Sequence, residues 1–278
     1  MNRHADVKPS STGLPSVCTA AAAAAEDFRH NDHTTHSQKW FSLVFIATAL
    51  ALLGLGIARL VAQTTIPSPA VVALVLVGWL LADFLSGLLH WAADTWGRVD
   101  MPVLGRRLLH PFRVHHVNPH DILGRGFLDL NGDVAAVCLP FLAFALWLPL
   151  EHSHTQALSL LLTAAAGFAL PTNQIHQWAH MPRPPRWVRW LQAGRLVLTH
   201  RGHARHHANP AGGHYCITTG WCNAALTAAG FYVALERFVT ATTGCRPRSD
   251  PCTAFSLQVA QPREAQTRKT VALRQDQD

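Results

Sequence analysis

The stretch that decides the fold runs from Ala70 to Asp94 and reads AVVALVLVGWLLADFLSGLLHWAAD. Its apolar part is long enough to cross the hydrocarbon core of a bilayer, which takes about 20 residues of helix. Asp83 interrupts the run, and a carboxylate inside a span is costly unless it faces a polar site. Helical spacing places Asp83, His90 and Asp94 on one face, as a polar stripe towards the end of the span.

Further apolar segments repeat this pattern along the chain. They are residues 40–58, 134–150 and 155–175. The composition agrees, because 49% of the residues are hydrophobic and only 14% are charged, which is unusual for a soluble protein. Residues 186–199 mix tryptophans with arginines, which favours an interfacial amphipathic helix over a surface helix of a soluble domain. We therefore expect an all-α membrane protein with about four transmembrane helices, a histidine-rich cap and an interfacial helix.

Polar, aperiodic sequence flanks this region. We expect disordered tails at residues 1–38 and 241–278, and a membrane domain at residues 39–240. Residues 20–25 are all alanine and resemble the apolar part of a targeting peptide. Glu26 and Asp27 follow at once, which favours a tail instead.

The arginines orient the spans. They are concentrated in residues 95–133 and 176–207, whereas the turns at 63–69 and 151–154 contain no Lys or Arg. By the positive-inside rule, both termini and both arginine-rich segments are expected in the cytoplasm. The net charge of +7 is spread over several segments, which favours a membrane surface over nucleic acid as the partner. The Ala- and Arg-rich composition favours a bacterial inner membrane over the endoplasmic reticulum.

Histidine is the outlying residue type, with 18 copies. Eight lie in segments that the expected topology places on the cytoplasmic side: His90, His115, His116, His176, His180, His203, His206 and His207. His152 and His154 fall on the opposite side and are excluded.

Spacing suggests how these histidines group. Histidines four residues apart point the same way on a helix, so His176 and His180 can bind one ion. His115 and His116 are adjacent and cannot share a helix face. Either they bind different ions or their segment is not helical.

Eight imidazoles exceed one zinc site, which takes three or four ligands and often includes cysteine. The six cysteines show no C-x-x-C spacing, and we interpret them as free thiols. The set suits two borderline ions such as iron. We expect Asp83 and Asp94 to accept the other ring N–H of a ligand histidine, with direct ligation by Asp94 as an alternative.

At this point four motifs carry a resemblance to a known family. They are ADFLSGLLHWAADTWG (82–97), PFRVHH (111–116), NQIHQWAH (173–180) and YCITTGW (215–221). Together they resemble the plasmanylethanolamine desaturase family, which is similar in turn to the plant plastid desaturase acting on phosphatidylglycerol. The likeness covers about residues 40 to 248. It implies a four-span lipid desaturase whose eight histidines hold a di-iron centre at the cytoplasmic face.

The chain departs from the animal members of that family at three positions. A further histidine stands there where this chain has Arg125, Gly202 and Ala211. Nearby residues that could complete the metal shell are His120, Asn131 and His214.

The resemblance implies a reaction and its partners. The substrate would be an ether phospholipid, and hydrogen removal at C1 and C2 of its O-alkyl chain would give the vinyl ether of a plasmalogen. Dioxygen would be reduced to water with two electrons from a cytochrome b5- or ferredoxin-type donor. The alternatives are desaturation or hydroxylation of another lipid chain, for example on phosphatidylglycerol, and a non-enzymatic metal carrier. Carriers place acids and histidines through the middle of several spans, and here only Asp83 lies at depth.

Arginines close to the ligand candidates in sequence have two interpretations. They are Arg113, Arg125, Arg201 and Arg205. They could dock an acidic electron donor or hold the lipid phosphate. They could equally be topology signals.

Overall fold

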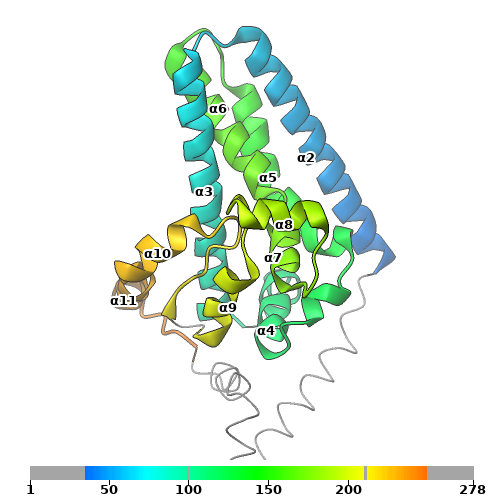
Figure 1. Cartoon of the computed structure of the whole chain (residues 1–278), viewed down its shortest axis with the longest axis vertical. Coiled ribbons are helices and arrows are strands. Elements are labelled where there is room, and N and C mark those ends of the chain that lie inside the picture. Colours follow the sequence, from blue (N-terminus) through cyan, green and yellow to red (C-terminus); the bar gives the residue numbers. More distant parts are fainter. Residues whose placement is uncertain (1–34, 99, 210–211, 249–278) are drawn as a thin grey trace, which may run out of the picture. The chain divides into compact units, whose positions relative to one another are not determined.

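The computed structural model describes residues 35–98, 100–209 and 212–248, and every regular element among them is helical (Figure 1). Long helices form one part of the molecule: α2 (His36–Gln63), α3 (Ser68–Thr95), α5 (Phe127–Trp147) and α6 (Ser153–Ala169). Four helical segments are long and apolar enough to cross a membrane, the fourth running from α6 to His180. The predicted all-α membrane class is confirmed. The tails predicted at 1–38 and 241–278 lie largely outside the described residues.

The long helices pack in two pairs, α2 against α5 and α3 against α6. Small residues allow the close approach, as is common between membrane helices. A Cβ added at Gly78 of α3 would lie 2.7 Å from the Cβ of Ala164 in α6. A Cβ added at Gly132 of α5 would collide with Ser42 of α2. Each pair therefore has a glycine where the backbones are closest.

Large apolar side chains point away from both pairs. Leu50, Val77 and Phe141 are 56%, 49% and 49% exposed, although they lie well inside their helices. A water-soluble protein rarely exposes so continuous an apolar surface, and a bilayer covers it. The outward faces of the long helices are therefore the lipid-facing surface.

The helices extend beyond the apolar runs from which they were predicted. Apolarity marks only the part inside the hydrocarbon, so polar turns at the ends of α2 and α5 were missed. Arg59, near the end of α2, donates from its guanidinium to the carbonyl oxygens of Leu146, in the last turn of α5, and Leu148, its C-cap. A cation at the carboxyl end of a helix is favourable because it meets the negative end of the helix dipole.

The fourth apolar run is interrupted. Leu170 and Pro171 separate α6 from α7 (Thr172–His180), because proline offers no N–H to continue the helix. The predicted interfacial helix at 186–199 is shorter than expected. It is α8 (Arg186–Ala193), whose C-cap is Gly194. The next residue, Arg195, has the left-handed conformation with φ 56°, which the helix cannot continue through.

Short helices gather at one end of the long ones and form the cap (Figure 1). Besides α7 and α8 they are η1 (Gly105–Leu109), α4 (His110–Val117), η2 (Asp121–Gly124), α9 (His200–Ala208), α10 (Trp221–Ala228) and α11 (Phe231–Thr243). The turn that carries His152 and His154 joins α5 to α6 at the opposite end (Figure 1). The cap is thus the part of the chain where the histidine motifs meet.

Candidate metal centre

The eight predicted histidines come together inside the cap, and seven of them are buried. Their ligand atoms form two groups, in each of which all atoms lie within 4.8 Å of one another. The five-histidine group is His115, His176, His180, His203 and His207. The carboxylate group is His90, Asp94, His116 and His206. Asp94 lies among the candidate ligands of this second group, which agrees with the alternative of direct ligation that the sequence left open.

In the five-histidine group, ring nitrogens face one another in a chain of close contacts. The Nε2 atom of His203 lies 2.8 Å from Nε2 of His176 and 2.9 Å from Nε2 of His207. The Nε2 atom of His207 also lies 3.0 Å from Nε2 of His115. A neutral imidazole nitrogen either carries one proton or offers one lone pair, so these three contacts cannot all be good hydrogen bonds. A cation shared by the lone pairs satisfies all of them.

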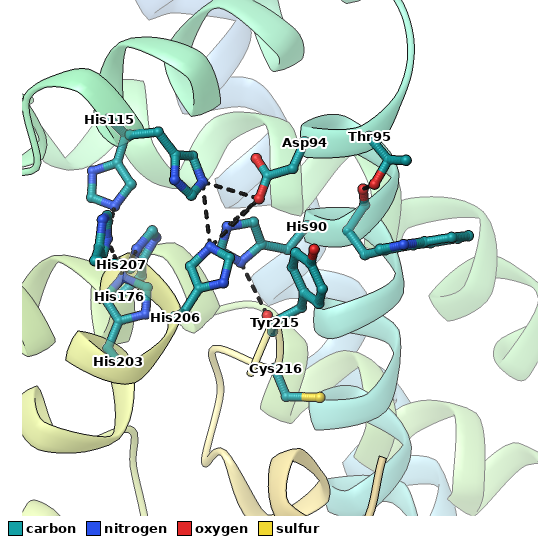
Figure 2. Close-up of polar contacts among 12 residues, drawn as sticks. His90, Asp94, Thr95, His115, His176, His203, His206, His207, Tyr215 and Cys216 are labelled. Atoms are coloured by element: carbon teal, nitrogen blue, oxygen red, sulfur yellow. Dashed lines mark hydrogen bonds and ion pairs between the residues drawn. The ribbon is translucent and has the colours of Figure 1, made fainter. Parts of the chain in front are cut away.

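In the carboxylate group, backbone carbonyls fix two of the rings. Figure 2 shows the first of these contacts, between His90 and Tyr215. His90 donates from Nδ1 to the carbonyl oxygen of Tyr215 at 3.0 Å, and His206 donates from Nδ1 to that of Gly213 at 3.0 Å. With the proton on Nδ1, each neutral ring leaves a lone pair on Nε2. Both Nε2 atoms therefore face the centre of the group as acceptors.

Asp94 gives a second reason to expect a cation in this group. Its Oδ2 atom lies 3.2 Å from Nε2 of His90 and 3.5 Å from Nε2 of His206. It lies 3.0 Å from Nε2 of His116 as well. A carboxylate oxygen facing two lone pairs is repulsive, and a proton on the carboxyl could bridge to only one ring. A positive ion between these atoms removes the conflict.

The protonation state of the cap histidines suits metal binding. Burial, followed by the nearby histidines, holds the pKa of His115, His203 and His207 well below the usual value. For His206, burial outweighs the nearby Asp94 and lowers the pKa to about 4. These rings are neutral at pH 7, which is the form that binds a metal ion.

The spacing of the nitrogens is also that of ligands around an ion. Metal–imidazole bonds of about 2.1 Å at right angles put neighbouring nitrogens roughly 3 Å apart. The closest Nε2 contacts are 2.8 to 3.0 Å in the five-histidine group, and the His206–His116 contact is 3.3 Å. The donor set, with imidazoles and one carboxylate and no thiolate, fits a borderline metal such as iron.

Two short helices serve both groups. On α4, the adjacent residues His115 and His116 belong to different groups. Their segment is helical, so the alternative of a non-helical segment is wrong, and the binding of different ions stays a prediction. On α9, His203 and His207 are four residues apart and belong together, whereas His206 belongs to the carboxylate group. The His176–His180 pair on α7 falls in one group, as its spacing predicted.

The expected contact between Asp83 and a histidine was wrong. Asp83 is fully buried, and its Oδ1 atom accepts from the backbone N–H groups of Thr219 and Gly220 at 2.7 and 2.8 Å. Its Oδ2 atom accepts from the N–H of Cys222 at 3.0 Å, in the first turn of α10. Seven helical residues correspond to about 10 Å along the axis, too far for Asp83 to reach the group around His90. Asp83 holds the loop that carries the Tyr215 carbonyl.

Of the three residues considered as additional ligands, His120 and His214 lie outside both groups. His120 is exposed and His214 is partly exposed. Asn131 is buried and donates from Nδ2 to the carbonyl oxygen of Phe127, while its Oδ1 atom has no hydrogen-bond partner. A direct contact of any of them with a metal stays a prediction.

Sequence reasoning missed the groups that orient the ligands. The carbonyls of Tyr215 and Gly213 are backbone atoms, so no residue type reveals them. His200 was also missed; it donates from Nδ1 to the carbonyl oxygen of Ala179, beside His180. The available signal for His200 was its place in the sequence, three residues before the ligand candidate His203. Cys138, Cys216, Cys222 and Cys245 are free thiols, as predicted.

The fold and the centre define a class: an all-helical membrane protein with two adjoining histidine-rich sites able to hold metal ions. Residues 79–250 match the lipid desaturase domain model, and the chain belongs to that family. It is 43% identical over 176 residues to a plasmanylethanolamine desaturase of Myxococcus xanthus, covering 63% of each chain. It is 40% identical over 192 residues to plasmanylethanolamine desaturase 1 of Mus musculus, covering 66% of this chain and 70% of that protein.

A plant relative is more distant. The chain is 34% identical over 175 residues to chloroplastic fatty acid desaturase 4 of Arabidopsis thaliana, covering 62% of this chain and 52% of that one. The match spans less than two thirds of the Myxococcus relative as well. No solved structure matches the chain.

Proposed function

We propose that this protein is a membrane lipid desaturase that converts the O-alkyl chain of a plasmanyl phospholipid to the vinyl ether of a plasmalogen. In this proposal the five-histidine group and the carboxylate group each hold one iron ion. Dioxygen is the oxidant, and an external cytochrome b5- or ferredoxin-type protein supplies two electrons.

The arrangement of the two groups is the observation that carries the proposal. Two adjoining sets of converging lone pairs, one of them around a carboxylate, provide for two ions. Identity supports the ether lipid over an acyl chain, because both relatives named plasmanylethanolamine desaturase are more similar to this chain than the chloroplastic fatty acid desaturase is.

Iron supplies the activation of dioxygen that removes hydrogen from an unactivated methylene, which side-chain acids and bases cannot do. The electron count is simple. Breaking two C–H bonds and forming the C=C bond releases two electrons and two protons from the alkyl chain. Reduction of dioxygen to two waters takes four electrons and four protons. The remaining two electrons come from the donor protein, with two protons from solvent.

The chain's own groups do three things in this reaction. The carbonyls of Tyr215 and Gly213 hold His90 and His206 in the tautomer that points Nε2 inward. Among the described residues, Asp94 is the only carboxylate in either group, and it offsets the charge of a bound cation. Burial keeps His115, His203 and His206 neutral and keeps bulk water away from their ligand atoms.

We also propose that the cap and both termini face the cytoplasm, in a bacterial inner membrane, as the arginine distribution predicts. Arg59 lies at the other end of the helices, where its guanidinium donates to carbonyl oxygens at the end of α5, and a single arginine does not outweigh the eleven in the two cap segments. In domain terms, the desaturase unit includes residues 39–240, and helices α2 and α11 extend it to His36 and Thr243.

The test is expression of the full chain in cells that lack plasmalogens but contain their plasmanyl precursors, followed by lipid mass spectrometry. We expect an acid-labile ether phospholipid two hydrogens lighter than its precursor. The His176→Ala variant, expressed to the same level, is the matched control and should give none. A new acyl double bond with unchanged ether lipids would instead assign the protein to acyl-chain desaturation. No change in any lipid in cells that contain a compatible donor would contradict the desaturase assignment.

A further inference from the structure

Helix α9 has two chemically different faces. Its inner face carries His203 and His207, which belong to the five-histidine group, and His206, which belongs to the carboxylate group. Its outer face is exposed and consists of Arg201, Ala204, Arg205 and Ala208. A helix is about 10 Å across with its side chains, so this single helix separates the candidate metal centre from the surface. His207, at the edge between the faces, is the only partly exposed histidine of the eight.

The positive charge of this outer face is not compensated nearby. Arg201 and Arg205 are one turn apart, and within the described ranges neither makes an ion pair. The sequence from residue 152 to 235 contains six arginines and no Asp or Glu at all. Charges of one sign on a water-facing surface steer an oppositely charged partner towards it.

The other two arginines near the ligands are occupied. Arg113 donates to the carbonyl oxygens of Trp96 and Gly97, after the end of α3. Arg125 makes an ion pair with Asp121 at 2.9 Å. These two brace the cap internally. Only the α9 pair presents both guanidinium groups to a partner.

The neighbouring basic helix, α8, has a different character. Its exposed face combines Arg186 and Arg189 with Trp187 and Trp190, which are 50% and 74% exposed. That mixture is typical of a helix lying in the membrane interface. In Figure 1, α8 lies beside the ends of the long helices, and α9 lies further down the cap. The outer face of α9 carries only alanines between its arginines, so it suits water and a protein partner rather than lipid.

We propose that the outer face of α9, centred on Arg201 and Arg205, is the docking surface for an acidic electron-transfer protein. This inference rests on the proposed function, in which two electrons per turnover come from outside the chain. They enter across α9, by way of His207 and His203, because this one helix carries exposed arginines on its outer face and candidate ligands on its inner face. Each donor molecule is oxidised by one electron, and the pair of electrons completes the reduction of dioxygen.

The test compares two double charge reversals that change the net charge equally. Arg201→Glu/Arg205→Glu alters α9, and Arg186→Glu/Arg189→Glu alters α8. Both variants and the parent protein are reconstituted as full chains in phosphatidylcholine nanodiscs. The probe is the soluble, acidic haem domain of a cytochrome b5. Its Kd is measured at low and high ionic strength, with metal-free and metal-loaded protein, so that the readout does not depend on desaturation.

We expect the α9 variant to bind the probe at least about tenfold more weakly at low salt, and to lose the salt dependence of the parent. The α8 variant should bind like the parent. In the metal-loaded protein, reoxidation of the reduced probe should slow in the α9 variant alone, while the iron content of all three proteins stays equal.

Three results would overturn the docking surface. They are equal weakening in both variants, undiminished binding by the α9 variant, and failure of the parent to bind the probe at low salt. Loss of co-purifying phosphatidylglycerol from the α9 variant with unchanged probe binding would assign these arginines to a lipid head group instead. Failure of the plasmalogen assay with intact binding through α9 would refute the proposed product and leave the docking surface standing.

Discussion

The five-histidine group and the carboxylate group share two helices and differ in the third. Helices α4 and α9 each place neighbouring histidines in different groups, so they hold the two groups side by side. Helix α7 contributes only to the five-histidine group, and α3 contributes only to the carboxylate group. The ring centroids of His116 and His207, one from each group, are 5.3 Å apart.

The two groups therefore differ both in the number of ligands and in their charge. The five-histidine group offers five imidazoles, and the carboxylate group offers three imidazoles and one carboxylate. Asp94 also lies on the same long apolar helix as Asp83, one helical turn after His90. The two groups should therefore respond differently to the loss of one ligand, and the following changes test this comparison.

The largest effect is expected from removing one ligand at the heart of each group. His176→Ala and His206→Ala should each lower product formation by at least about 100-fold, while the protein still accumulates in the membrane. Each variant keeps the other group intact, so the metal content should fall by about one ion per chain. Product is measured by lipid mass spectrometry and metal by elemental analysis of purified protein. Full activity of both variants would refute the assignment of the groups to a metal centre.

A smaller loss is expected when the charge alone is removed. Asp94→Asn keeps the size of the side chain and should reduce activity by about 10- to 100-fold, with metal lost from the carboxylate group. The matched change in the other group, His180→Gln, removes one of five neutral donors and should cost less. Metal content and turnover of the two variants are compared in the same nanodiscs. A greater loss for His180→Gln would show that the anion does not distinguish the groups.

The next largest effect is expected from loosening the loop that orients the carboxylate group. Asp83→Ala removes three acceptor contacts to backbone N–H groups and leaves those amides buried. Losses of this kind cost about 3 kcal/mol, which should lower the thermal denaturation midpoint by roughly 10 °C. Asp83→Asn keeps one carbonyl oxygen, so its denaturation midpoint should fall between those of the parent protein and Asp83→Ala. An unchanged midpoint for Asp83→Ala would show that the loop holds its position without this carboxylate.

The smallest effect is expected from histidines at the far end of the helices. His152 and His154 stack on each other with ring centroids 5.4 Å apart and belong to neither group. The double change to alanine should leave metal content and turnover within about twofold of the parent, because these residues are exposed surface positions. A loss of metal in this variant would mean that the two ends of the molecule are coupled.

Spacing along the sequence predicted contacts within one helix and little beyond it. The His176–His180 pair followed directly from a four-residue interval on α7. Asp83 was misplaced because a shared face says nothing of distance along the axis, and its partners lie more than 130 residues away. The partition of His115 and His116 between two groups depends on where α3, α7 and α9 lie around α4, which no local pattern contains.

The apolar runs predicted the spans well and their ends poorly. Hydrophobicity marks the residues inside the bilayer, so the polar first turns of α5 and the Arg59 turn of α2 gave no apolar signal. Pro171 was visible in the sequence, but whether it would bend or divide the fourth run depends on packing against α5. The carbonyls that orient His90 and His206 carry no signature, because every residue has one.

The contact of Asp83 with residues 219, 220 and 222 has a consequence for the biosynthesis of the protein. All four apolar segments leave the ribosome well before the last ligand at residue 207 and before the loop that secures His90. The spans can therefore insert into the membrane before the metal groups are complete. A chain arrested before residue 222 would contain all four spans and every ligand of both groups, but it would lack the Cys222 N–H that donates to Asp83.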